Sequence, residues 1–351
     1  GYRMQQPILE TMNLKQNFSF NENNRVWAKN SQIFDFKAGA FGITFTGKFS
    51  HIYTNYVFKD KFDKDTFGKE IVYFEKDSNK KDSLYWKGIR PIPLTEEEVA
   101  DYVEKDSIQT LHNSKAYLDS IDRKNNKFKI FDVLSGYTYR NSFKNTRYTY
   151  DGFISLSNIN FNTVQGWNFG TGLSFNTYNE ETGKYTNVRT DFNYSVAEDR
   201  LRVTGSFIHR FNRDNNATLY LTGGSKAEQY NESEPITRWL NMFRTLVYEN
   251  NYMKLYDNTF AKAQYQQNIV TGIFMAGNIE YTRRKALTNN TDYVLINSKD
   301  DYTSNNPLDP ESDAPAFETH NLMKARLYAN IRFGEKYISR PDGKIPVRNG
   351  D

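Results

Sequence analysis

Cysteine is absent from this chain of 351 residues, which excludes disulfide bonds, thiolate metal sites and thiol catalysis. There is also no run of about 18 consecutive apolar residues, so no transmembrane helix is predicted. Apolar residues make up only 38% of the chain, less than is typical of a soluble globular protein. The net charge of +4 is too mild to indicate nucleic-acid binding.

Aromatic residues are abundant, in contrast, at 16% of the chain, and most of them are tyrosine or phenylalanine. A packed soluble core draws mainly on leucine, isoleucine, valine and alanine. A barrel with a wet interior needs only one apolar face per strand, plus aromatic belts at the two membrane interfaces. The composition therefore favours a membrane β-barrel over an enzyme core.

From about residue 150 the apolar side chains recur at every second position, as in Val188, Phe192, Tyr194 and Val196. Eight strands are predicted, at residues 152–163, 166–178, 184–196, 200–211, 217–223, 258–269, 271–286 and 319–333. None of these contains a proline, as a continuous ladder requires. Most are long enough for a tilted membrane strand, which needs about 9–11 residues.

The rest of the chain divides by its pattern. Residues 1–30 are predicted to be an irregular polar lead, residues 31–135 a periplasmic α+β segment, and residues 335–351 a truncated tail. Two strands are expected between Ile33 and Phe58 and another at Glu70–Phe74, and the capping-box pair Thr95 and Glu98 predicts a helix start. A second helical piece is expected at residues 108–121.

Two insertions interrupt the predicted strands. Residues 235–256 have apolar side chains at helical spacing, and that stripe is expected to pack within the chain. It could serve as a lumen plug, a periplasmic extension or a partner-binding face. Residues 287–318 form a long polar loop with three prolines, which is assigned to the cell exterior because long barrel loops face outward.

The candidate site is a basic lumen, formed by the strand positions that alternate with the apolar ones and would face the barrel interior. Its members are Arg189, Arg202, Arg210, Lys262, Lys324, Arg326 and Arg332. On the same parity stand two acidic residues, Asp191 and Glu280. Such a lumen would favour anions or bind an acidic plug. Alternatively, further strands carry the balancing carboxylates.

No catalytic, cofactor or metal site is predicted. The four histidines are scattered without metal-ligand spacing. Gly170–Gly172 lies in a strand and lacks the helix that a dinucleotide site needs. An acidic cluster at residues 300–313 could hold calcium, but it matches no known calcium-loop spacing, and a solvated loop is the favoured interpretation.

Three separated motifs resemble one known family. They are Arg90–Glu98 with its flanking Tyr85-Trp86 and Lys105–Ser107, then Phe161–Gly166, and finally Lys336–Pro341. They resemble Bacteroidota outer-membrane proteins that have a carboxypeptidase-like regulatory domain followed by a β-barrel of unknown function, and Phe161–Gly166 is also similar to a motif of surface-antigen barrels of the Omp85 type. The resemblance covers residues 30–345 and implies location and architecture, but no catalytic residues.

The predicted fold class is mainly β: an antiparallel transmembrane β-barrel, incomplete in this chain, with a small α+β periplasmic segment before it. The predicted function is transport, export or assembly at the outer membrane, without enzymatic activity or cofactors, and with outer-membrane lipid and periplasmic or outer-membrane proteins as partners. Two alternatives remain: a TonB-linked nutrient receptor-like barrel and a soluble all-β glycan-binding module.

Overall fold

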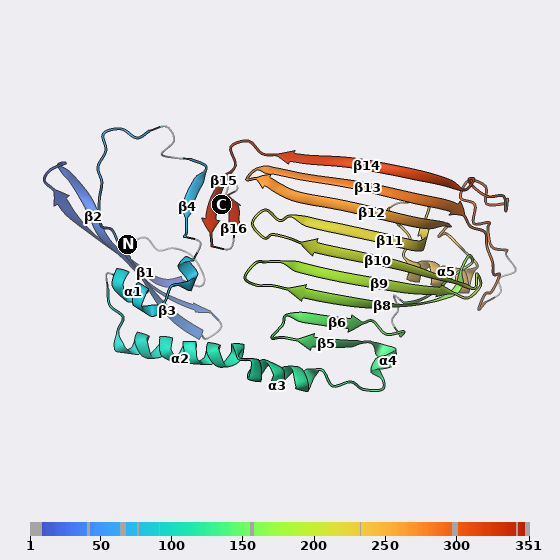
Figure 1. The fold of residues 1–351 in the computed structure, drawn as a ribbon, viewed down its shortest axis with the longest axis horizontal. Coiled ribbons are helices and arrows are strands. Elements are labelled where there is room, and N and C mark those ends of the chain that lie inside the picture. The colour runs from blue at the N-terminus through green and yellow to red at the C-terminus, as the bar shows by residue number, and fades with distance from the viewer. Residues whose placement is uncertain are drawn as a thin grey trace. The chain divides into compact units, whose positions relative to one another are not determined.

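The computed structural model describes residues 9–40, 43–63, 68–75, 77–90, 92–154, 158–231, 233–296, 301–341 and 343–347. The chain divides into two compact units. The first comprises residues 1–68 and 80–95, and the second comprises residues 69–79 and 96–351. Both are built mainly from β-strands, and the mainly β fold class predicted for the chain is confirmed (Figure 1).

The first unit is a three-stranded antiparallel sheet with one short helix. Its strands are β1 (Leu9–Asn21), β2 (Val26–Ala40) and β3 (Ile43–Ile52), with β2 in the centre. Phe34, Phe36 and Phe49 form an aromatic cluster across β2 and β3. The helix α1 (Ser83–Ile89) begins after Asp82, whose side chain accepts a hydrogen bond from the amide of Tyr85 at 2.8 Å.

A ten-stranded antiparallel sheet dominates the second unit (Figure 1). Its strands are β5 (Tyr137–Asn141), β6 (Thr146–Tyr150), β7 (Ile159–Asn162), β8 (Gly166–Tyr178), β9 (Tyr185–Ser195), β10 (Arg200–Arg210), β11 (Thr218–Gln229), β12 (Leu255–Val270), β13 (Ile273–Ala286) and β14 (His320–Ile331). From β8 to β14 each strand pairs with the next one along the chain. Within the described residues, β5 and β14 are the two edges and do not pair with each other.

Smaller elements accompany this sheet. The helices are α2 (Glu96–Asn113), α3 (Lys115–Asn125), α4 (Asp132–Ser135) and α5 (Arg238–Tyr248), with a short 3-10 turn, η1 (Ser78–Lys80). The buried carboxylate of Asp122 in α3 accepts hydrogen bonds from the amide and hydroxyl of Ser142. A second small sheet is formed by β4 (Glu70–Tyr73), β15 (Lys336–Arg340) and β16 (Gly343–Val347), in which β4 lies parallel to β15.

The strand register sorts the side chains of the large sheet into two faces. Cross-strand partners share a face, and successive residues alternate between faces. One row across seven strands is entirely apolar: Phe175, Val188, Phe207, Leu221, Ala263, Ile279 and Ala325. The adjacent row on the opposite face is entirely polar: Ser174, Arg189, Ser206, Thr222, Lys262, Glu280 and Lys324.

Burial is inverted relative to a soluble protein. On the apolar face Ile279 is 54% exposed and Leu327 is 90% exposed, whereas Arg202, on the polar face, is 2% exposed. Large exposed apolar surfaces normally mark contact with another apolar phase or partner. No helix in the described part of the chain is both long and apolar enough to cross a membrane.

Several sequence predictions were wrong in detail. Within the predicted irregular lead at residues 1–30, residues 9–30 contain β1 and the start of β2, and the side chains of Met12, Leu14, Phe18 and Phe20 follow a period of two, while residues 1–8 lie outside the described residues. Residues 31–135 are not one segment, because α2 and α3 belong to the unit of the large sheet. The predicted tail contains β15 and β16.

The long strands were predicted more closely than the short ones. Residues 166–178, 184–196, 200–211, 258–269, 271–286 and 319–333 correspond to β8, β9, β10, β12, β13 and β14. The strand predicted at 152–163 is reduced to β7, with residues 155–157 outside the described residues. The prediction missed β5 and β6, whose five residues each are too few for a clear period.

Candidate functional site

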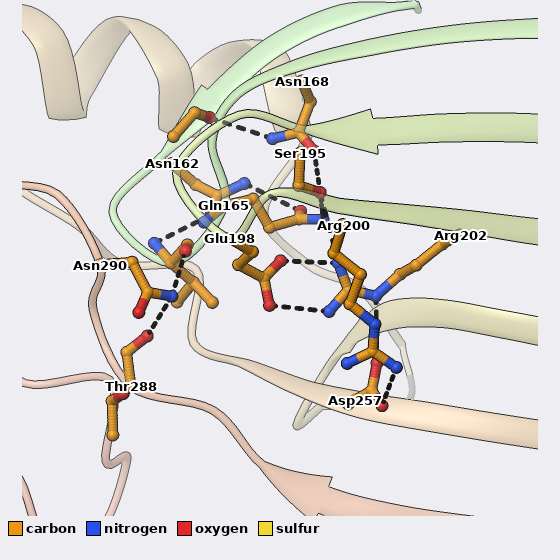
Figure 2. Close-up of polar contacts among 12 residues, drawn as sticks. Asn162, Gln165, Asn168, Ser195, Glu198, Arg200, Arg202, Asp257, Thr288 and Asn290 are labelled. Carbon is orange, nitrogen blue, oxygen red and sulfur yellow. Dashed lines mark hydrogen bonds and ion pairs between the residues drawn. The ribbon is translucent and has the colours of Figure 1, made fainter.

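Buried polar side chains cluster at the end of the sheet where β8 begins and β9 ends. Figure 2 shows this cluster, which we call the polar cap: Asn162, Gln165, Asn168, Ser195, Glu198, Arg202 and Asp257. It joins the β7–β8 turn, the β9–β10 turn and the first residues of β12. The polar cap combines buried charged and neutral polar side chains that bond one another, and it is the candidate site.

The β7–β8 turn supplies one side of the polar cap. The side-chain oxygen of Asn162 accepts hydrogen bonds from the amides of Val164 at 3.1 Å and Gln165 at 2.8 Å, which folds the turn on itself. Gly166 follows with a φ of +65°. A Cβ at Gly166 would lie 2.7 Å from the Cβ of Ala197, so the neighbouring turn requires glycine here.

Arg202 forms the electrostatic centre of the polar cap. Its two terminal nitrogens donate to the Glu198 carboxylate at 2.6 and 2.8 Å, in a bidentate pair. Its Nε donates to Asp257 at 3.0 Å. Arg200 also contacts Asp257, at 2.9 Å, so two guanidinium groups balance two carboxylates. The buried charges are thereby compensated within the cluster.

Neutral side chains complete the polar cap around Arg202. Ser195 donates to Asn168 at 3.0 Å and accepts from Gln165 at 2.8 Å. Asn168 donates to the Gly166 carbonyl at 3.0 Å. These bonds tie the start of β8 to the end of β9. The arrangement fixes the geometry of this end of the sheet and compensates its buried charges.

Helix α5 packs on this end of the sheet through polar residues. Thr237 caps its first turn by accepting from the amide of Leu240, and Asn241 and Thr245 are fully buried on its inner side. Asn241 donates to Asn251 at 3.2 Å and accepts from the amide of Met253 at 2.9 Å. Asn251 in turn donates to Thr163 of the β7–β8 turn, which connects α5 to the polar cap.

The predicted helix at residues 235–256 is therefore present but shorter. The expectation that its apolar stripe packs within the chain was wrong for most of that stripe, because Trp239 is 54% exposed and Phe243 is 44% exposed. The helical spacing was set by five apolar residues, of which Leu246 alone is buried: Trp239, Leu240, Phe243, Leu246 and Val247. The reason is that the buried hydrogen bonds of Asn241 and Thr245 hold the polar side of α5 against the sheet.

The hydrogen bonds of Asn241 lead to a stability prediction. We expect Asn241→Leu to loosen α5, because it leaves the amide of Met253 and the side chain of Asn251 without their partner, at a cost of about 1–3 kcal/mol. Hydrogen exchange of residues 238–254 measures this loss. The same substitution at the exposed Asn321 of β14 is the control, and equal exchange in both variants would contradict the assignment.

The long loop after β13 is also anchored at this end. Asn305 donates to the carbonyls of Leu255 at 2.7 Å and Leu287 at 2.6 Å, and its oxygen accepts from the amide of Leu255. Lys254 donates to the Thr303 hydroxyl at 2.8 Å. Burial lowers the pKa of Lys254 to about 8 and raises that of Tyr302 to about 12.

The low pKa of Lys254 predicts a specific pH dependence. Between pH 8 and the ordinary value of 10.5, the unfolded chain binds a proton at Lys254 that the folded chain does not, so folding stability rises with pH in this window. Lys254→Met should be more stable than the parent at pH 7 and should lose this rise. Urea unfolding at pH 7 and 10 measures both effects.

A matched control for this experiment is Lys144→Met, which changes an exposed lysine on the β5–β6 turn. It should retain the parental pH dependence. If Lys254→Met retains the same dependence, burial of the Lys254 amine does not govern the stability of the loop.

The structure brings most of the predicted basic residues to one face. In the register Arg189, Arg202, Arg210, Lys262, Lys324 and Arg326 share a face, and Arg332 lies just beyond the end of β14. Arg189 pairs with Asp191 and with Asp151 at 2.5 Å. Arg210 donates to the carbonyl of Gly183, and Arg332 pairs with Glu335.

Sequence reasoning missed the acidic partners of this face. Asp151 and Glu198 lie in loops between strands, and Asp257 lies near the start of β12. The prediction considered only the alternating positions inside the predicted strands, and it therefore overlooked these three residues. They offset Arg189, Arg200 and Arg202, which means that part of the balancing charge comes from this chain's own turns. A further basic excess lies on β12 and β14, where Lys262, Lys324 and Arg326 lie around Glu280 of β13.

The acidic loop and the histidines do not converge on a metal site in the described residues. No group of three or more histidine, cysteine, aspartate or glutamate side chains there is placed to hold a metal ion. Asp300 of the predicted acidic cluster lies outside the described residues. Asp309 uses its carboxylate to accept from the amide of Glu311, as in a local turn.

Comparison with known proteins gives a family but no activity. Residues 131–351 match the model of the C-terminal domain of a family of unknown function, DUF5686, and residues 1–56 match the model of the same family. No curated protein and no solved structure matches the chain.

Proposed function

The chain belongs to the DUF5686 family, whose function is unknown, and we propose that it is an outer-membrane β-barrel protein acting in transport, export or assembly of other molecules. The observation that carries this proposal is the inverted sheet. Most of its apolar row is exposed on one face, and its polar row occupies the other. This distribution of side chains is expected of a sheet whose apolar face contacts lipid and whose polar face lines a water-filled interior.

Strand length supports the same proposal. The strands β8 to β14 have between 11 and 16 residues. A tilted strand needs about 9–11 residues to cross the hydrocarbon layer, whereas globular strands average about 5–6. All seven strands reach the required length, and they are antiparallel throughout.

The edges of the sheet set a requirement for the proposal. Each unsatisfied backbone group exposed to lipid costs several kcal/mol, so only closed sheets span membranes. In the described residues β5 and β14 each pair with one strand. In the membrane they must therefore pair with each other or with further strands to close a barrel.

The remaining parts of the proposal concern location and partners. Residues 31–135 precede the long strands, and we place them in the periplasm, where they would contact protein partners. The role assigned to the barrel involves no catalysis and no cofactor. Its polar face, with the basic excess on β12 and β14, would contact the transported or assembled molecule.

Membrane integration tests the proposal directly. The full chain, folded into vesicles of phosphatidylethanolamine and phosphatidylglycerol, should stay with the membrane after washing with alkaline carbonate or urea. It should also migrate faster on gels without heating than after heating, as closed barrels do. A chain that remains monomeric and soluble without detergent would overturn the proposal and favour a soluble binding module.

A further inference from the structure

A small cavity lies on the polar face of the large sheet, next to the polar cap. Its volume is about 250 Å³, and its walls include residues of β8, β9, β10 and β11 together with Arg238, the first residue of α5. In the register Asn193 of β9 lies opposite Arg202 of β10. Asp191 lies opposite Thr204, two residues further along, so all four side chains share the polar face. We call the space between these five residues the α5 cavity.

One charge on the wall of the α5 cavity has no partner. Three other charged side chains there are paired with the opposite sign: Arg202 with Glu198 and Asp257, Asp191 with Arg189, and Lys226 with Glu228. Asp191 accepts from Arg189 through both carboxylate oxygens, at 3.1 and 2.6 Å, so it offers no free carboxylate. Within the described residues, Arg238 has neither an acidic nor a hydrogen-bonding partner.

Two neutral side chains on the same wall are also unused by the fold. Asn193 and Thr204 are half-buried, and neither side chain makes a hydrogen bond to the described part of the chain. Gly170 lines the cavity beside Asn193, and a Cβ there would lie 3.7 Å from the Asn193 Nδ2. Half-buried polar groups normally have a hydrogen-bond partner. The amide and the hydroxyl are therefore available to a ligand.

We infer that the α5 cavity binds a small oxyanion, the carboxylate or phosphate group of a solute, through Arg238, Asn193 and Thr204. A guanidinium donates two parallel hydrogen bonds to such a group, and its charge strengthens both. The amide and the hydroxyl add donors from the sheet side of the cavity. Pockets for drug-sized ligands have volumes of roughly 300–1,000 Å³, so this smaller cavity suits a small acid or phosphate.

The inference deepens the proposed function and rests on it for its biological role. The polar face of the sheet would contact the transported or assembled molecule, and the α5 cavity would make that contact selective for acidic solutes. The basic excess on β12 and β14 lies on the same face and would attract the same class of solute: Lys262, Lys324 and Arg326.

Chemical modification of arginine tests the inference on the unaltered full chain. Phenylglyoxal reacts with accessible arginines, and a bound oxyanion should protect Arg238 from it. The chain is kept in a non-ionic detergent, so that lipid phosphate does not compete, and each arginine is followed by peptide mass spectrometry. Acetate, inorganic phosphate and chloride are compared at equal ionic strength. Arg244 is the internal control, because it lies in the same helix and bonds the Tyr252 hydroxyl at 3.1 Å.

Acetate or phosphate should protect Arg238 and leave Arg244 unprotected. Protection by acetate alone would identify the ligand group as a carboxylate, and protection by phosphate alone would identify it as a phosphate. Equal protection by chloride would mean that ionic screening alone shields Arg238, and it would overturn the inference. Protection by glucose without protection by either anion would also overturn it, because the cavity would then take a neutral solute.

A pair of variants tests the contribution of the sheet. Thr204→Val removes a hydroxyl with little change of shape, and it should raise the anion concentration for half-protection roughly three- to tenfold. Ser206→Ala removes a hydroxyl from the same face of β10 outside the cavity and should match the parent. Equal half-protection concentrations in the two variants would overturn the proposed site.

The outcome is independent of the membrane test. Protection of Arg238 in a chain that does not integrate into membranes would leave the oxyanion site standing while the proposed function falls. Membrane integration without protection would overturn the site and leave the proposed function in place.

Discussion

Replacing Arg202 by methionine is expected to destabilise the folded chain by about 3–5 kcal/mol, because it leaves two buried carboxylates without their counter-charge. Glu198 and Asp257 both contact the Arg202 guanidinium, and the side chain of each is 8% exposed. The side chain of Arg202 is 1% exposed, so solvent cannot replace its guanidinium. Urea unfolding in vesicles, followed by tryptophan fluorescence, measures the loss.

Arg200→Met is the matched control for Arg202→Met. Arg200 contacts the same Asp257 carboxylate, at 2.9 Å, but its side chain is 38% exposed. Exposed ion pairs are worth about 0–1 kcal/mol. The control should therefore unfold close to the parent. Similar losses in both variants would mean that Arg202 is not the centre of the polar cap.

The second large effect is expected from a charge placed on the apolar face of the sheet. Ala263 and Gln264 are neighbours in β12 but point to opposite faces. Ala263 pairs with Leu221 and Ile279, whereas Gln264 pairs with Tyr220 and Asn278. Ala263→Lys should cost about 2–4 kcal/mol in a bilayer, as lysine does near the membrane midplane, and should reduce insertion into vesicles.

Gln264→Lys adds the same side chain one residue away and should insert like the parent. The comparison controls for strand propensity and net charge, since both variants carry the same substitution in the same strand. If the two variants insert equally well, the apolar face is not in contact with lipid.

How far the sequence predicted the fold depended on the length of each element. The period of two across β8, β9 and β10 persists for more than ten residues, which predicts both the strand and the parity of its apolar side chains. The strands β5 and β6 have five residues each and were missed. The pairing of β4 with β15 joins residues 70 and 337. Local sequence patterns cannot predict a pairing between residues so far apart in the chain.

The candidate site was predicted only in part, for a related reason. The parity of β10 correctly placed Arg202 on the polar face, but its partners Glu198 and Asp257 lie in a turn and in another strand 55 residues away. The register between β10, β11 and β12 brings them together, and the local sequence cannot specify that register. The side of α5 that packs against the sheet was also predicted wrongly. The apolar stripe was expected to face inward, but the buried hydrogen bonds of Asn241 hold the polar side there instead.

The most direct test of the membrane account is a nitroxide scan of eight successive positions in β12, residues 259–266, each as a single-cysteine variant in vesicles. Collision rates with oxygen and with a water-soluble nickel chelate should alternate with a period of two, with oxygen dominant at 261, 263 and 265 and the chelate dominant at 262, 264 and 266. Equal access of the chelate to both faces would show that the strand is surrounded by water, and the outer-membrane assignment would have to be abandoned.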